Sequence, residues 1–432
     1  MSRKGLSGPL TIAAKRVEPR MALGADFMMI DPVKFSQRAT RLQRSAVREF
    51  VKLTARPGMI SFAGGLPAPE LFPLEAIQQA AARVFSQIGR RTLQYGETEG
   101  VLELRQWLAK SFSTESFKVR SENVLITSGA QQALHLIGLV LIDEDDVVLT
   151  EDPTYLALLA AWRSLGARFV GVLPDAQGIC IDALAHATST QPQPGAPKLL
   201  YLQPNYQNPQ GTTMASGRRS AVMELVRSRG LFVIEDNAYG ELRYEGDALP
   251  HLLYLANEAP GSGPDEGRVA HVGTFSKIIA PGLRLGWVIG PAVLIDKLTQ
   301  AKQAADLHTS TLNQYLALEL LADGFLERHL PMLRTAYRTR RDTMLQALAH
   351  HFPADLVRTR PQGGLFLMLT LAGRRNARDY LQRALAEGVA FVPGDEFHLD
   401  GGGSNTMRLN FSNPPPNEIE EGIAKLRRAV SP

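Results

Sequence analysis

The chain has 432 residues, 44% of them hydrophobic and 21% charged, and its formal net charge is +4 at pH 7. Such a small net charge, without a dense Lys/Arg tract, argues against nucleic-acid binding. No apolar run reaches the roughly 18 residues that span a bilayer. The single cysteine, Cys180, excludes an intrachain disulfide and favours a reducing compartment. We therefore expect a cytoplasmic protein with neither nucleic-acid nor membrane partners.

The beginning of the chain predicts an extension followed by a helix. Basic residues dominate the first two dozen positions, which resembles a targeting segment, but a flexible extension over residues 1–30 is the preferred interpretation. Helical spacing then runs from Lys34 to Leu53, and a second helix is predicted from Leu74 to Gly89. Between them, Gly64 and Gly65 lie in a loop where the backbone could approach a ligand closely.

The middle of the chain alternates short β-branched runs with helical segments, a pattern that predicts a mostly parallel sheet with helices on both faces. Ligands bind such sheets beyond the carboxyl ends of the strands. The predicted strands are Val124–Thr127, Val147–Thr150, Phe169–Val172, Leu199–Gln203, Leu231–Ile234, Val269–Phe275 and Gly286–Ile289.

The pattern changes after Thr309. Two amphipathic helices, Leu312–Leu321 and Leu326–His350, precede short strands and one further helix, which predicts a smaller α+β domain. The expected division is therefore an extension at 1–30, an N-terminal segment of the small domain at 31–60, a large domain at 61–325 and the rest of the small domain at 326–432. The fold class is α/β, with seven strands in the large domain.

A lysine directly after an apolar strand is the first candidate for chemistry. Lys277 follows the run that ends at Phe275, and a buried ammonium is costly unless it is paired or neutralised. A Schiff base with an aldehyde cofactor would remove its charge. Thr274, Ser276 and Arg284 would then supply donors and a positive charge for a phosphate. The alternative is a surface lysine on a turn.

Three further strand ends carry polar or aromatic groups. The segment 127–132 ends a strand and opens an apolar helix, so its free N–H groups form either an anion site or an ordinary helix cap. Tyr155 could lie over a flat ring or belong to the core. Asn208 precedes a proline, which holds it extended with a free amide.

The carboxylate at the end of the strand before Tyr239 is the most informative residue. Asp236 emerges from an apolar strand and needs a cationic partner, and a protonated pyridine nitrogen is one. Tyr239 could donate to a phenolate oxygen. Each residue alone has a structural explanation, but their shared position at strand ends of one sheet favours a common site.

Taken together, these motifs resemble the class I/II aminotransferases of fold-type I, which use pyridoxal phosphate (PLP), and among them the 2-aminoadipate and kynurenine branch. The resemblance spans about Phe35 to Arg428 and specifies fold and cofactor more than substrate. The motifs are S-F-A-G-G-L-P-x-P-E-L-F-P at 61–73, L-Q-Y-G at 93–96, T-S-G-A-Q-Q-A-L at 127–134, Q-N-P-Q-G at 207–211, E-D-N-A-Y at 235–239, F-S-K-I-I-A-P-G-L-R-L-G at 275–286 and M-R-L-N-F at 407–411.

The resemblance implies a role for each matched residue. Lys277 would bond the cofactor and move the proton, Asp236 would pair with the pyridine nitrogen, and Tyr155 would stack on the ring. Asn208 and Tyr239 would hold the ring hydroxyl, and Arg408 the substrate α-carboxylate, near Gly65. The phosphate would lie among Gly129, Ala130, Gln131, Thr274, Ser276 and Arg284, with Tyr95 from a second subunit of a homodimer. Relatives often have a hydroxyl residue where Ala130 stands, so one phosphate contact would fall to the backbone.

The implied reaction is ping-pong transamination between an L-amino acid and 2-oxoglutarate or pyruvate. In this branch an arginine of the N-terminal helix can meet an acidic side chain, and Arg41 stands at that position, with Arg38 and Arg44 as alternatives. We expect broad specificity that covers 2-aminoadipate or glutamate and large apolar or aromatic amino acids. The rivals are a PLP lyase or decarboxylase, and a ligand-sensing transcription regulator, for which the region before Phe35 offers no helix-turn-helix pattern. No metal site is predicted, because the nine histidines form no metal-binding motif.

Overall fold

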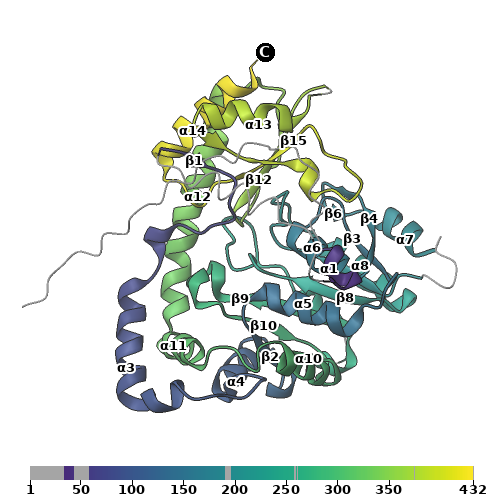
Figure 1. Ribbon diagram of the computed structural model, residues 1–432, viewed down its shortest axis with the longest axis vertical. Helices are drawn as coiled ribbons and strands as arrows, with labels where there is room; N and C mark the ends of the chain where they lie inside the picture. The colour runs from purple at the N-terminus through teal and green to yellow at the C-terminus, as the bar shows by residue number, and fades with distance from the viewer. Residues whose placement is uncertain are drawn as a thin grey trace, which may run out of the picture.

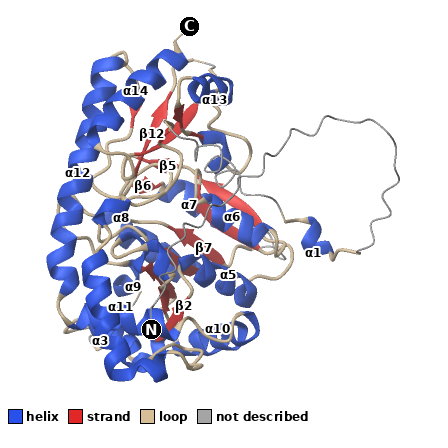
Figure 2. Cartoon of the chain, turned by 60° about the vertical axis from the view of Figure 1, so that its left-hand side comes forward, coloured by secondary structure: helices blue, strands red, loops and turns tan. Residues whose placement is uncertain are grey.

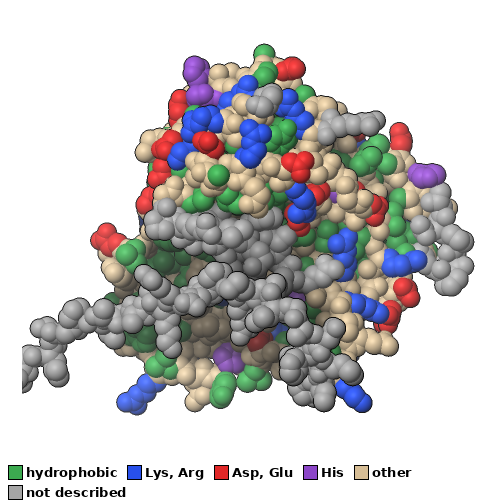
Figure 3. All heavy atoms as spheres, turned by 45° about the horizontal axis from the view of Figure 1, so that its top comes forward, with side chains coloured by type: hydrophobic (Ala, Val, Ile, Leu, Met, Phe, Trp, Pro, Cys, Tyr) green, Lys and Arg blue, Asp and Glu red, His purple; other side chains and the backbone are tan. Residues whose placement is uncertain are grey.

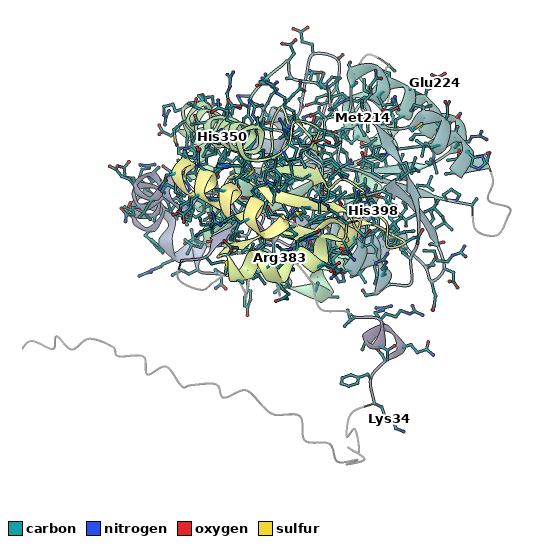
Figure 4. The ribbon with its side chains drawn as sticks, turned by 90° about the horizontal axis from the view of Figure 1, so that it is seen from above. Lys34, Met214, Glu224, His350, Arg383 and His398 are labelled. Atoms are coloured by element: carbon teal, nitrogen blue, oxygen red, sulfur yellow. The ribbon has the colours of Figure 1, made fainter. Side chains whose placement is uncertain are left out.

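The computed structural model describes residues 34–42, 58–189, 196–256, 259, 261–373 and 375–431. The predicted extension at 1–30 and most of the helix predicted at 34–53 lie outside these ranges. The described part of that helix is the single turn α1 (Gln37–Thr40). Figure 4 shows Lys34 and this turn lying apart from the body of the molecule.

The central element is a seven-stranded sheet with the strand order β2-β10-β9-β8-β7-β3-β4. Only β10 among these strands runs antiparallel to its two neighbours, so the prediction of a mostly parallel sheet in an α/β fold is confirmed. The strands are β2 (Val124–Thr127), β3 (Val147–Glu151), β4 (Arg168–Val172), β7 (Leu199–Leu202), β8 (Phe232–Asp236), β9 (Val269–Thr274) and β10 (Gly286–Ile289).

Alternate residues of these strands face two different apolar layers. In β8, Val233 belongs to one buried cluster and Ile234 to the other, as the two-residue period of a strand requires. One layer contains α5 (Ala130–Leu141), α6 (Leu156–Arg163) and α10 (Ala292–Ala305). The other contains α4 (Leu102–Ser111), α7 (Ile181–Ser189), α8 (Ser216–Arg229) and α9 (Leu252–Leu255). The sheet is therefore covered on both faces, as Figure 2 shows.

A second, four-stranded antiparallel sheet is built from the C-terminal part of the chain, and it lies at the top of Figure 1. Its order is β11 (Val357–Arg358), β12 (Phe366–Thr370), β15 (Thr406–Asn410) and β14 (Val392–Pro393). The helices α12 (Phe325–His351), α13 (Ala377–Ala386) and α14 (Pro416–Val430) accompany it. Early residues join this region, because β1 (Ile60–Ser61) pairs in parallel with β13 (Val389–Ala390).

Two contacts tie this C-terminal region to the end of β3. The amide of Thr154 donates a 2.9 Å hydrogen bond to the carbonyl of Phe397. Nδ1 of His398, which Figure 4 labels, lies 2.9 Å from Oδ1 of Asp152. The remaining elements are α3 (Leu74–Thr92), α11 (Thr311–Ala322), the hairpin β5 (Pro174–Asp175) and β6 (Gly178–Ile179), and the 3-10 turns η1 (Pro69–Leu71), η2 (Ser121–Asn123), η3 (Pro264–Glu266), η4 (Phe275–Lys277), η5 (Pro281–Leu283) and η6 (Gly394–Phe397).

Basic and acidic side chains are interspersed over the upper part of the face drawn in Figure 3. No helix among the described residues is long and apolar enough to cross a bilayer. The domain boundaries near residues 60 and 325 stay a prediction.

Candidate active site

A cavity of about 750 Å³ opens at the carboxyl ends of the parallel strands, where the strand order predicts ligand binding. Its polar lining comes from several separate strand ends of the sheet, together with Arg408 from strand β15 of the second sheet and Gly65 from the segment after β1. The predicted site residues that line it are Gly65, Ala130, Gln131, Tyr155, Asn208, Asp236, Tyr239, Thr274, Ser276, Lys277, Arg284 and Arg408.

The antiparallel strand β10 explains why Arg284 belongs to this cavity. Gly286 at the start of β10 pairs with Thr127 and with Thr274, which are the last residues of β2 and β9. The residues just before β10, which include Arg284, therefore lie beside the residues that follow β2 and β9. Nη2 of Arg284 donates a 3.1 Å hydrogen bond to the carbonyl of Ser128, which fixes the guanidinium beside the first turn of α5.

The loop before α5 is shaped for close approach of the backbone to an anion. Gly129 caps α5 with φ of 89°, a conformation that glycine adopts at low cost. A Cβ there would come within 2.6 Å of the Arg284 guanidinium. The free N–H groups of the first turn and the positive end of the helix dipole thus face the same region as a fixed arginine.

Lys277 ends the 3-10 turn η4 that follows β9. The Thr274 side chain caps this turn by accepting from the amide of Ser276 over 3.1 Å. Nζ of Lys277 donates a 2.9 Å hydrogen bond to the carbonyl of Gly65. Burial, followed by the charges of Arg284 and Arg408, lowers the pKa of Lys277 to about 8. About half of this amine is therefore unprotonated at pH 8, and the unprotonated form is the one that acts as a nucleophile.

Asp236 lies at the end of β8 and is held rigidly. Its Oδ2 accepts from the Tyr201 hydroxyl over 2.6 Å and from Nε2 of Gln203 over 2.9 Å. Its Oδ1 is buried and has no hydrogen-bond partner within the described part of the chain. Burial raises the pKa of the Asp236 carboxyl, against the effect of its hydrogen bonds with Tyr201, Gln203 and the backbone of Ala238. A cation facing Oδ1 would restore the ionised form.

Two aromatic residues and one amide complete the lining near Asp236. Tyr155 stands at the start of α6, and its hydroxyl donates a 3.4 Å hydrogen bond to Oε1 of Gln131. Burial raises the pKa of Tyr239, so its phenol stays protonated and can donate. Asn208 precedes a cis proline, and its Oδ1 is already engaged by Arg408.

Arg408 in β15 is a buried guanidinium held in one orientation. Nη1 donates to Oδ1 of Asn208 over 2.8 Å and Nη2 to the carbonyl of Ala63 over 2.6 Å. The Phe366 ring centroid lies 4.3 Å from the guanidinium carbon and the Phe397 centroid 4.8 Å. Burial lowers the pKa of Arg408 to about 10, so it remains a cation at neutral pH. Its Nε has no partner among the described residues.

Three predicted site residues do not line this cavity, namely Gly129, Tyr95 and Arg41. Gly129 directly precedes Ala130, which does line it. Tyr95 is 78% exposed, and its ring edge lies against His308. Arg41 forms an ion pair with Glu144, which precedes β3 and so lies at the amino end of that strand. Leu42, the residue after Arg41, does line the cavity. A role for Tyr95 in a second subunit and a role for Arg41 in substrate selection remain predictions.

The structure also brings together a Glu/His cluster that no sequence motif indicated. Nδ1 of His271 lies 3.0 Å from Glu235 Oε2, and Nδ1 of His251 lies 3.6 Å from Oε1. The Glu235 oxygens already accept from the amides of Leu252 and Leu253 over 2.9 and 3.2 Å. The carboxylate thus caps the start of α9, and these bonds occupy much of its capacity to bind a metal.

Sequence reasoning missed the residues that orient the site. Tyr201 and Gln203 hold Asp236, and Phe366 and Phe397 enclose Arg408. The register of β7 and β8 pairs Tyr201 with Ile234, so Gln203 comes opposite Asp236. The two-residue period of β7 could have identified Tyr201 and Gln203 as residues on the same face, but only the strand order places them beside Asp236.

Comparisons with known proteins decide the family. The model of the family "Aminotransferase class I and II" matches residues 59–426. The chain belongs to this family. It is 44% identical over 396 residues to the 2-aminoadipate transaminase of Thermus thermophilus, covering 92% of this chain and 96% of that protein. It is 39% identical over 401 residues to aromatic-amino-acid aminotransferase 1 of Thermococcus litoralis, covering 92% and 94%.

A solved structure gives the same result. The α-aminoadipate aminotransferase of Thermus thermophilus in complex with N-(5'-phosphopyridoxyl)-L-leucine superposes with a TM-score of 0.83 at 42% identity, covering 92% of this chain and 97% of that one. This aminotransferase therefore transfers amino groups of amino acids to 2-oxo acids with PLP as cofactor.

The residues present fit PLP. The buried, unpartnered Oδ1 of Asp236 suits a protonated ring nitrogen, and the amine of Lys277 suits an aldehyde. The glycine-capped start of α5 beside Arg284 suits a phosphate. The three features line or adjoin one cavity.

Proposed function

We propose that the protein transaminates a broad set of L-amino acids, including 2-aminoadipate or glutamate and large apolar or aromatic ones, with 2-oxoglutarate or pyruvate as acceptor in ping-pong order. The observation that carries this proposal is the combination of one fixed carboxylate clamp, Arg408, with a cavity that has an apolar wall. That wall is formed by small or apolar side chains, Leu42, Leu156, Ala157, Ala160 and Ala161.

We assign the cofactor contacts as the matching motifs imply. Gly129, Ala130, Gln131, Thr274, Ser276 and Arg284 would hold the phosphate, Asn208 and Tyr239 the ring hydroxyl, Tyr155 the ring face, and Asp236 the ring nitrogen. Thr274 and Ser276 already share a 2.9 Å hydrogen bond, which supports their joint assignment. PLP, when bound, supplies an aldehyde for an amine and an electron-poor ring that stabilises negative charge.

The protein's own groups then control the proton and the substrate. Nζ of Lys277 would take the proton from the substrate Cα and deliver it to the carbon of the cofactor that carried the aldehyde, a role that its lowered pKa supports. Nε of Arg408, together with a neighbouring Nη, binds the substrate α-carboxylate in a bidentate geometry that lysine cannot supply. Phe366 and Phe397 keep the guanidinium in plane for this contact.

Arg41 is our candidate for binding an acidic side chain. Leu42 lines the cavity, so its neighbour needs only a local rearrangement to reach it. Arg41 would first have to leave Glu144. Surface ion pairs of this kind contribute at most about 1 kcal/mol, so the exchange is inexpensive.

A donor panel tests these assignments. Wild type, Arg41→Ala, Arg38→Ala and Arg44→Ala are assayed with glutamate, 2-aminoadipate, leucine and phenylalanine, and the oxo-acid and amino-acid products are quantified. We expect Arg41→Ala to lose activity with the two acidic donors and to keep it with the two apolar ones. Equal glutamate rates in wild type and Arg41→Ala would remove the acidic half of the proposal. A product that lacks the donor's carboxylate, without a new amino acid, would indicate a decarboxylase instead.

We further propose a cytoplasmic homodimer in which Tyr95 reaches the partner's cofactor phosphate. The 78% exposure of the Tyr95 ring outside its own cavity supports this assignment. Sedimentation should give twice the chain mass, and Tyr95→Phe should weaken PLP binding. A monomer that retains full activity would contradict the shared site.

A further inference from the structure

An ion pair between a buried lysine and an exposed aspartate adjoins the first turn of α5, and neither residue lines the cavity. Lys302 in the last turn of α10 is fully buried, and its Nζ donates to Oδ1 of Asp306 over 2.6 Å and to Oε1 of Gln132 over 3.0 Å. Asp306 follows α10 directly and is its C-cap. A lysine without solvent contact is costly to bury and requires a reason.

The carboxylate of Asp306 also accepts hydrogen bonds from two residues at the start of α5, one just before the helix and one in its first turn. Oδ2 of Asp306 accepts from the hydroxyl of Ser128 over 2.9 Å and from Nε2 of Gln132 over 2.6 Å. Gln132 in turn accepts from the amide of Ser128 over 2.7 Å. Ser128 and Gln132 thus bracket residues 129–131, which we assigned to the phosphate.

The network also reaches the arginine of the phosphate site. The carbonyl of Ser128 accepts from Nη2 of Arg284 over 3.1 Å, so whatever fixes Ser128 also fixes that guanidinium. Burial works to raise the pKa of Asp306, but its hydrogen bonds from Lys302 and Gln132 outweigh this effect and lower the pKa below the usual value. Asp306 is therefore an anion at neutral pH, and Lys302 screens it from any phosphate in front of the loop.

We propose that Lys302 and Asp306 are positioning residues for the cofactor phosphate, which they serve by fixing Ser128, Gln132 and Arg284 without touching the cofactor. This inference rests on the phosphate site assigned under Proposed function. The two residues preorganise the loop, so that binding does not have to order it.

The test compares PLP with pyridoxal, which has the same ring and aldehyde but no phosphate. Dissociation constants for both are measured by titrating the cofactor-free full-length chain of wild type, Asp306→Asn and Lys302→Met. We expect Asp306→Asn to weaken PLP binding about tenfold to a hundredfold, the range for a lost charge-assisted hydrogen bond, and to leave pyridoxal binding within about twofold of wild type. Lys302→Met should act in the same direction, because it leaves Asp306 unscreened.

Matched controls come from the exposed side of the same helix. Asp296 and Lys297 both bond to Gln300, so Asp296→Asn and Lys297→Met make the same chemical changes away from the loop. They should bind both ligands as wild type does. Should Asp306→Asn fail to fold, Ser128→Ala offers a second test, because it removes one of the two hydrogen bonds that Asp306 Oδ2 accepts at the start of α5. It should likewise weaken the binding of PLP and leave that of pyridoxal unchanged.

The results distinguish a failure of the positioning role from a failure of the phosphate site itself. Unchanged PLP binding in Asp306→Asn, or equal losses for PLP and pyridoxal, would overturn the positioning role while the phosphate site itself stands. Equal affinity of wild type for PLP and pyridoxal would remove the phosphate site, and this inference with it.

Discussion

Arg408 donates a 2.8 Å hydrogen bond to Oδ1 of Asn208, and this contact joins the four-stranded sheet to the loop that follows β7. The residue assigned to the substrate carboxylate is therefore hydrogen-bonded to a residue assigned to the cofactor ring. Substrate binding and cofactor orientation are coupled through one side-chain contact.

Replacement of Arg408 by lysine should separate charge from geometry. Arg408→Lys keeps a cation but cannot bond Asn208, Ala63 and a carboxylate together, so we expect KM for amino donors to rise about a hundredfold with a smaller change in kcat. Steady-state kinetics measure this. Arg358→Lys in β11, which is separated from β15 by β12 in the same sheet, is the control. An unchanged KM would contradict the clamp.

Removal of the Asp236 charge should reduce catalysis while PLP stays bound. We expect Asp236→Asn to lower kcat/KM about a thousandfold, the order seen when a preorganised electrostatic group is lost. Tyr201→Phe removes only one hydrogen bond to the carboxylate and should cost about tenfold. Equal effects of the two variants would indicate that Asp236 does not act through its charge.

The stability of the cofactor-free protein should reveal the lowered pKa of Lys277. Its folded pKa of about 8 lies below the ordinary 10.5, so between these values the unfolded state binds more protons and stability rises with pH. Lys277→Met lacks this dependence. Because Lys277 is still partly exposed, solvent screens its charge, and we expect the variant to be about 2 kcal/mol more stable at pH 7. Urea unfolding at pH 7 and pH 10.5 checks this, and the difference should vanish at the higher pH.

Glu151 at the end of β3 should show the opposite pH dependence. Burial raises its pKa to about 7 from 4.5, so its favourable contribution is complete below pH 4.5 and is lost as pH rises through 7. Glu151→Gln should match wild type near pH 4.5 and exceed it by roughly 3 kcal/mol at pH 8. Unfolding free energies at both values measure this. Glu144→Gln, at an exposed position, should show no such change.

The chain pattern predicted the sheet because β-branched runs and helical runs alternate at regular spacing. It predicted the strand ends as the site because polar residues follow each apolar run directly. It could not predict that β10 is antiparallel, so the contact of Arg284 with Ser128 was not predicted. The hydrogen-bond partners of Asp236 and Lys302 could not be predicted from the sequence. Tyr201 comes beside Asp236 only through the strand order, and Gln132 comes beside Lys302 only through helix packing.

Some predictions depend on parts that one described chain does not contain. Tyr95 is exposed and does not line the cavity of its own chain, so its proposed role requires a second copy. Arg41 directly follows the turn α1, and residues 43–57 lie outside the described part of the chain. Their roles follow from resemblance, and the variants proposed above test them.

The most direct test asks which lysine bonds the cofactor aldehyde. The PLP-loaded protein is reduced with borohydride and digested, and the peptides are analysed by mass spectrometry. We expect a phosphopyridoxyl mass on the peptide that contains Lys277 and on no other. A modified peptide that contains Lys302 or another lysine instead, or none that carries the added mass, would contradict it.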